Sequence, residues 1–164
     1  LFEGMDNVKY FRYDKKMKLG RKRNIANNKC TNDIIVYMDD DDFYPPDRVK
    51  HAVTRLCSRP KIKVAGSSIM YMYYTHIDTI YSLGPYGKNH ATAGTFAFRR
   101  ELLDETCYED DAEKAEEKHF LKNYSFPMIQ LDPLKTILVI SHNKNTFDKK
   151  QILGQEKRFR MKKT

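Results

Sequence analysis

Four consecutive aspartates, Asp39 to Asp42, constrain this chain more than any other feature, because adjacent carboxylates repel one another unless a cation or basic side chains neutralise them. The run follows an apolar segment, residues 34–38, whose length and β-branched content are typical of a buried strand. Pro45 and Pro46 come next and predict that the strand stops and a helix begins. We therefore expect the acids at the C-terminal end of a central strand, which is where open α/β sheets bind ligands.

The acid run is a candidate metal site. Successive strand residues point to opposite faces, so Asp39 and Asp41 are expected to share one side of the strand and to reach one ion. Carboxylate oxygens suit Mg²⁺ or Mn²⁺, which usually keep some waters and bind substrate phosphates. A solvated acidic turn is the alternative, and the apolar segment directly before the run argues against it. His142, which follows the apolar segment 136–140, is a candidate third ligand, although a single histidine is more often structural.

Length and composition predict one soluble globular domain. The chain has 164 residues, of which 40% are hydrophobic and 32% are charged. We expect one folded domain over residues 1–150 and a basic, frayed tail over 151–164. No stretch is long enough for a membrane span, and no signal peptide is evident. The three cysteines have no metal-type spacing, which indicates free thiols in a reducing compartment, the cytoplasm (a host's cytoplasm if the source is viral).

Hydrophobic patterns predict an alternation of strands and helices. Strands are expected over residues 8–13, 62–74, 77–83, 128–131 and 136–140, the second and third as a hairpin. Short helices are expected over residues 25–28 and after Pro46, and an acidic helix over residues 108–121. The core-facing residues of the helix after Pro46 are expected to be Val49, Ala52, Val53 and Leu56.

Three further residues are candidates for a ligand site near the acids. Arg23 and Asn24 follow a basic segment and precede the apolar strand, and an arginine fork would suit a phosphate near those acids. Gly94 opens a segment that is expected to form a strand running into a short helix. Its missing side chain would allow close approach of a ligand, although an ordinary strand start is an equally good interpretation.

Taken in order, these pieces resemble the GT-A glycosyltransferases of family 2. The matching pieces are Arg23-Asn24, Asp39-Asp40-Asp41 with Pro46, Gly94 followed by Phe98-Arg99-Arg100-Glu101, the acidic pair Glu116-Glu117, and His142. The resemblance implies an α/β, Rossmann-like nucleotide-diphospho-sugar transferase fold, in which helices flank a central mixed sheet. The usual N-terminal strand and base-gripping segment are not evident, so we expect the catalytic domain to be truncated at its N-terminus.

The resemblance also implies roles for individual residues. Asp39, Asp41 and His142 would hold Mn²⁺ or Mg²⁺ against the diphosphate of a nucleotide sugar, with a UDP-sugar as the first candidate. Glu117 would be the general base that takes the proton of the acceptor hydroxyl, and Glu116 would orient it or bind the acceptor. The family usually has Glu-Asp at this pair. One in-line displacement would transfer the hexose with inversion to a glycan, protein or lipid acceptor.

The remaining donor-binding candidates come from the same resemblance. They are Arg23, Asn24, Asp40, Gly94, Lys144 and Asn145.

Two other functions compete with this interpretation. Residues 37–40 spell the YMDD of reverse-transcriptase palms, but a palm requires a second apolar strand directly afterwards, and here two more acids and two prolines follow. The net charge of +8 would instead suit a non-catalytic module that binds nucleic acid or another partner. Such a module would bind polyanions in a salt-sensitive way and would need no metal. Nucleic acid is not the partner that the motifs favour.

Overall fold

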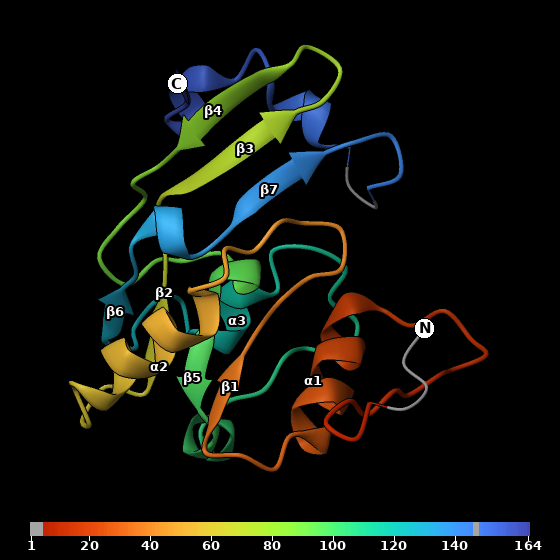
Figure 1. Ribbon diagram of the computed structural model, residues 1–164, viewed down its shortest axis with the longest axis vertical. Helices are drawn as coiled ribbons and strands as arrows, with labels where there is room; N and C mark the ends of the chain where they lie inside the picture. The colour runs from red at the N-terminus through yellow and green to blue at the C-terminus, as the bar shows by residue number, and fades with distance from the viewer. Residues whose placement is uncertain (1–4, 146–147) are drawn as a thin grey trace.

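Two four-stranded sheets organise the chain in the computed structural model, which describes residues 5–145 and 148–164 (Figure 1). The first sheet has the strand order β1-β5-β2-β6. Its strands are β1 (Ile34–Val36), β2 (Val64–Gly66), β5 (Ala97–Arg99) and β6 (Met128–Gln130). Strand β2 pairs with β6 in parallel and with β5 antiparallel, and β1 pairs with β5 antiparallel, so the sheet is mixed as expected.

Helices cover both faces of this first sheet. Alternate strand residues point to opposite faces, so each short strand contributes to two cores. One core includes Phe120 of α3 (Glu117–Phe120), and the other includes Leu56 of α2 (Arg48–Cys57). A third helix, α1 (Leu19–Lys29), contacts the end of β1, where Tyr37 donates a hydrogen bond to Asn27. The expected α/β arrangement, a mixed sheet flanked by helices, is confirmed.

The second sheet has the order β7-β3-β4-β8. Its strands are β3 (Met70–Tyr74), β4 (Thr79–Leu83), β7 (Leu138–Ser141) and β8 (Lys162–Lys163). The β3–β4 hairpin is confirmed, but the single strand expected over residues 62–74 is wrong, because the chain leaves the first sheet after β2. The backbone N–H groups of Ser67 and Ser68 donate to the side chains of Thr95 and Gln130 instead of to a ladder partner.

Two other predicted elements are also wrong. Residues 5–18 contain no strand, because alternation alone supplies no partner for the backbone. Only α3 forms within the acidic helix expected over residues 108–121, because an earlier part of this segment forms hydrogen bonds with α1 instead. The carbonyls of Asp110 and Ala112 accept the N–H groups of Arg21 and Gly20, which lie in the first turn of α1 and have no partner inside the helix. Helix α1 itself begins six residues earlier than predicted.

The helix after Pro46 forms as α2, but its buried stripe is shifted. The buried residues are Arg48, Ala52 and Leu56, spaced four apart, whereas Val49 is 48% exposed. The prediction that Val49 belongs to the core is therefore wrong.

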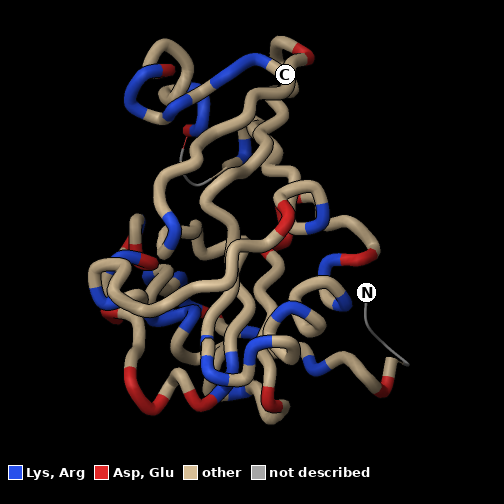
Figure 2. Tube along the Cα trace, turned by 90° about the vertical axis from the view of Figure 1, so that its left-hand side faces the viewer, with Lys and Arg blue, Asp and Glu red and all other residues tan. Residues whose placement is uncertain are grey.

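The C-terminal segment is folded, so the prediction of a frayed tail is wrong. It contains η4 (Lys149–Ile152), α4 (Glu156–Phe159) and β8, which pairs with β4. Ile152 and Met161 are buried against the second sheet, while Lys and Arg residues line the segment (Figure 2). The segment is basic in composition, but Ile152 and Met161 still attach it to the second core. The domain boundary near residue 150 stays a prediction.

Two expected features agree with the described part of the chain. None of its helices is long and apolar enough to cross a membrane. Cys30, Cys57 and Cys107 are free and exposed.

The packing of the C-terminal segment can be tested by Met161→Ala. Met161 is 7% exposed in the second core, so its truncation is expected to reduce the free energy of unfolding by about 2–3 kcal/mol. The exposed Lys163→Ala change in the same segment should stay within about 0.5 kcal/mol. Urea denaturation measures both values. Equal, negligible effects would show that the segment does not pack in solution.

Candidate active site

The acid run lies in a turn between the two sheets, not in a strand. Strand β1 ends at Val36, and Phe43 then pairs with Leu138 of β7 through N–H···O distances of 3.0 and 2.9 Å. The chain thus crosses from the first sheet to the second within the run (Figure 1). Strand alternation does not apply there, so the reason given for Asp39 and Asp41 sharing one face is wrong.

The polymerase-palm alternative is wrong as well. The palm motif lies in a hairpin, whereas β1 pairs with the distant β5, and α2 is the next element after the run.

Arg23 of α1 joins the acid run to the acidic pair. Its Nη1 lies 3.5 Å from Asp39 Oδ1, its Nε donates to Glu116 Oε1 at 2.9 Å, and its guanidinium lies over the Tyr37 ring. The Arg23 side chain is 12% exposed and that of Glu116 is 5% exposed. Burial alone would lower the pKa of Arg23, but the charges of Asp39 and Glu116 help to raise it, so the guanidinium stays protonated. The structure therefore brings together three of the predicted residues.

Gly94 lies directly against Asp39. A Cβ atom on Gly94 would be 2.9 Å from Asp39 Oδ2, and the glycine has no positive φ, so space is the constraint here. The Tyr44 hydroxyl accepts a hydrogen bond from Asp39 N–H at 2.8 Å and donates to the Gly94 carbonyl at 3.2 Å. The close approach predicted at Gly94 is thus an approach of the acid run itself.

Asp41 faces a different group of residues, which follow β7. Its Oδ2 accepts a hydrogen bond from Asn145 Nδ2 at 2.7 Å and lies 3.8 Å from His142 Nε2. Backbone contacts hold the histidine: Lys144 N–H donates to His142 Nδ1, and His142 N–H donates to Asn145 Oδ1. The structure therefore brings Asp41, His142 and Asn145 together. The Lys144 side chain is exposed at the edge of this group.

The other two aspartates have different surroundings. Asp42 is 7% exposed and accepts hydrogen bonds from Ile140 N–H at 2.8 Å and Lys149 Nζ at 3.4 Å. Burial raises its pKa, while these two donors act in the opposite direction. Asp42 thus anchors the run to β7. Asp40 is exposed, and within the described chain it makes no hydrogen bond or ion pair.

Asn24 is turned away from the acids. Its amide donates to the Tyr108 carbonyl and to Asp110 Oδ1, and its oxygen accepts from Tyr108 N–H. These contacts hold the loop before α3 against α1, and none of them involves the acid run. A donor-binding role for Asn24 stays a prediction.

Glu117 begins α3 beside Glu116. It is half-buried, and burial is the main cause that raises the pKa of its carboxyl, with the neighbouring Glu116 charge acting in the same direction. The Glu117 N–H and Arg23 act against this rise. Glu116 is held by Arg23, whereas no other side chain in the described residues binds the Glu117 carboxylate. Of the two acids, Glu117 is therefore the one free to take a proton.

The residues around Asp41 fit part of a divalent-cation site. In the described chain, no three His, Cys, Asp or Glu side chains form a group that could hold a metal. Asp41 Oδ2 and His142 Nε2 nevertheless face each other at 3.8 Å. His142 can bind an ion through Nε2 when its proton is on Nδ1, a tautomer that gives up the hydrogen bond from Lys144 N–H. Two protein ligands suffice for an ion that keeps waters and binds substrate phosphates. Asp39 is engaged with Arg23, and its role as a third ligand stays a prediction.

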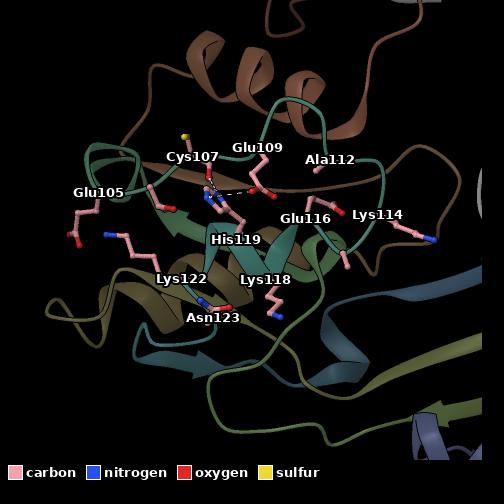
Figure 3. A pocket seen from close by; sticks show the side chains of 12 residues that line it. Glu105, Cys107, Glu109, Ala112, Lys114, Glu116, Lys118, His119, Lys122 and Asn123 are labelled. Carbon is pink, nitrogen blue, oxygen red and sulfur yellow. Dashed lines mark hydrogen bonds and ion pairs between the residues drawn. The ribbon is translucent and has the colours of Figure 1, made fainter.

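Two surface hollows lie near α1 and α3, and neither lies over the acid run. One of about 550 Å³ is lined by residues around α3 and touches the site through Glu116 (Figure 3). His119 lies inside it, with Nδ1 3.1 Å from the Cys107 carbonyl. The second, of about 380 Å³, is lined partly by Asn24. Neither hollow is lined by an aspartate of the run. The ion pairs of Arg23 with Asp39 and Glu116 therefore identify the candidate site better than the size of a cavity does.

Three residues that support the acid run were missed by the sequence analysis. They are Tyr44, Arg48 and Lys149. Arg48 is fully buried and its Nη2 donates to the carbonyls of Thr95 and Phe96 at 2.8 Å each, next to Gly94. In the sequence, Arg48 lies four residues before Ala52, a spacing that would have indicated that it shares the buried face of α2. Tyr44 and Lys149 gave none, because their contacts depend on segments far away in sequence.

The contact between Gly94 and Asp39 can be tested by Gly94→Ala. The new Cβ would lie 2.9 Å from the end of the Asp39 carboxylate and 3.3 Å from Ile137 Cδ1, so the free energy of unfolding is expected to fall by about 1–2 kcal/mol. Sugar transfer, the activity implied by the resemblance, should fall about 100-fold, because the carboxylate to which the resemblance gives a metal-binding role would move. Gly87→Ala is the control, since its Cβ would meet nothing closer than 3.8 Å. Equal activity in the two variants would mean that the position of Asp39 is unimportant.

Comparisons with known proteins agree with the motifs. No curated protein matches the chain. The family model described as glycosyl transferase family 2 matches residues 1–107, a range that contains Arg23, the acid run and Gly94. It does not reach the acidic pair or residues 142–145, and the roles of all the site residues stay predictions. The match covers most of the chain, and the chain therefore belongs to glycosyl transferase family 2, a family of glycosyltransferases.

Proposed function

We propose that this glycosyltransferase moves a hexose from a nucleotide-diphosphate donor, a UDP-sugar as the first candidate, to an acceptor hydroxyl in one inverting step that depends on Mn²⁺ or Mg²⁺. The observation that carries the proposal is the Arg23 bridge between Asp39 and Glu116. It holds the acids suited to the donor next to the acids suited to the acceptor. A single displacement needs both groups at one reacting centre.

On the donor side, Asp41 and His142 would hold the divalent cation, with Asp39 as the further candidate ligand. When bound, this ion supplies a Lewis acid that offsets the charge developing on the leaving diphosphate. Asn145 keeps the Asp41 carboxylate in a fixed orientation. Asp40 and the exposed Lys144 are free to contact the nucleotide sugar.

On the acceptor side, Glu117 would take the proton of the attacking hydroxyl. Its raised pKa makes it a stronger base than an ordinary glutamate. Glu116 is already engaged by Arg23, so we assign it the role of orienting the site. The acceptor can be a glycan, a protein or a lipid. A cytoplasmic location forms part of the proposal and is supported by the three free, exposed cysteines.

The donor class can be tested by thermal shifts. The chain is mixed with UDP, GDP, CMP or dTDP, each with and without Mn²⁺, and Asp41→Asn is run in parallel. One nucleotide is expected to raise Tm only with Mn²⁺, because ligand at 100 times its Kd stabilises the fold by about 2.7 kcal/mol. The variant should lose this shift.

The competing function gives the opposite pattern. If no nucleotide shifts Tm and the chain binds nucleic acid in a salt-dependent way, the non-catalytic binding module replaces the transferase.

The base can be tested by Glu117→Gln and Glu117→Asp. The amide of Glu117→Gln cannot accept the proton, so turnover with the donor that the thermal-shift test selects should fall about 10²–10⁴-fold. Glu117→Asp keeps a carboxylate, the one usual in the family, and should retain activity. The base works only when ionised. Because its pKa is raised, wild-type activity should decline on acidification at a pH above the 4.5 of an ordinary glutamate. A pH–rate profile measures this limb, and full activity in the amide variant would exclude Glu117 as the base.

A further inference from the structure

We infer that Lys149 binds the donor diphosphate and stabilises it as it leaves, which makes it a further catalytic residue of the site. This inference rests on the proposed function. Lys149 begins η4, outside the residues that the family model matches, and no motif points to it. Its assignment comes from its position in the fold.

The Lys149 ammonium lies at the acid run in a fixed position. Nζ donates to the Ile140 carbonyl at 2.9 Å and to Asp42 Oδ1 at 3.4 Å, and it lies 4.0 Å from Asp41 Oδ2. The Lys149 side chain is only 16% exposed. Two contacts therefore hold this cation between the aspartate that anchors the run and the aspartate that we assign to the donor site.

One N–H donor of the Lys149 ammonium remains available for a ligand. A lysine ammonium has three N–H donors, and Ile140 and Asp42 account for two of them. The 4.0 Å separation from Asp41 is an ion-pair distance and is too long for a hydrogen bond. A phosphate oxygen bound beside Asp41 could accept the third. The other lysines of this segment differ: Lys144 has an exposed side chain, and Lys150 Nζ donates to Asn143.

Charge balance favours the same assignment. A diphosphate that approaches the acid run meets negative charge, and Arg23 is already engaged by Asp39 and Glu116. Lys149 supplies positive charge on the other side of the run, and its two existing contacts hold it in place before the reaction. A charge positioned in advance costs no reorganisation when the leaving group develops its own charge.

The reaction balances without any proton from Lys149. The bond between the anomeric carbon and the terminal diphosphate oxygen breaks, and its electron pair stays on that oxygen. The acceptor oxygen forms the new bond to the anomeric carbon, and its proton passes to Glu117. Lys149 remains protonated and donates a hydrogen bond to the departing diphosphate.

The test compares diphosphate with monophosphate binding. Kd values for UDP, GDP, CDP and dTDP and for the four matching monophosphates are measured by calorimetry with Mn²⁺. In Lys149→Gln, affinity for the preferred diphosphate should fall about 10–100-fold, the value of a charged hydrogen bond, while affinity for the monophosphate changes little. Lys150→Gln removes the same charge from the next residue and should leave both affinities unchanged.

A second pair of variants separates binding from structural support. Asp42→Asn breaks the Asp42–Lys149 pair but keeps the cation, so it should lower Tm and retain the preference for diphosphate. If Lys149→Gln fails to fold, the double variant Asp42→Asn/Lys149→Gln, which leaves no buried carboxylate unpaired, should lose that preference. Lower stability with an unchanged preference would overturn the inference alone. If wild-type protein binds no nucleoside diphosphate, the proposed function fails first.

Discussion

The ion pairs of Arg23 are the interactions on which the rest of the site depends. One guanidinium satisfies Asp39, which follows the first strand, and Glu116, which precedes a helix far away in sequence. Without this cation the Glu116 carboxylate, whose side chain is 5% exposed, would be left unpaired, and an unpaired buried charge costs several kcal/mol. The ion pairs therefore hold together the two groups of acids that we propose for the donor side and the acceptor side.

The crossing between the two sheets gives each aspartate a separate role. A strand would have placed alternate carboxylates on the same face, where their repulsion could be relieved only by bound cations. In the turn, Asp39 meets Arg23, Asp41 meets His142 and Asn145, and Asp42 is used to hold β7. Protein cations therefore pair directly with Asp39 and Asp42, while Asp40 and Asp41 keep negative charge at the turn. A ligand at this turn contacts residues of both sheets.

Patterns that depend on near neighbours could be predicted from the sequence, and contacts between distant segments could not. The apolar run of β1 and the helix after Pro46 follow from local spacing, whereas Gly94 could be read equally well as an ordinary strand start until the fold placed it against Asp39. The prediction of an acidic helix over residues 108–121 was wrong because two carbonyls of this segment accept hydrogen bonds from the first turn of α1. The prediction of a frayed tail was wrong because two apolar residues among many charged ones pack that segment against the second sheet. Arg48 shows the limit most clearly: its spacing indicated burial, but only the fold shows which carbonyls it binds.

The acids and most of their partners come from opposite ends of the chain. The family-matched region supplies the acid run, Arg23 and Gly94, while the segment from β7 to η4 supplies His142, Asn145 and Lys149. Strand β7 joins the two because its backbone pairs with Phe43 immediately after the acids. Any change that shifts β7 must therefore move three polar partners relative to the run at once. The second sheet is accordingly part of the proposed catalytic site, since its residues set the electrostatic environment of the acids that follow β1.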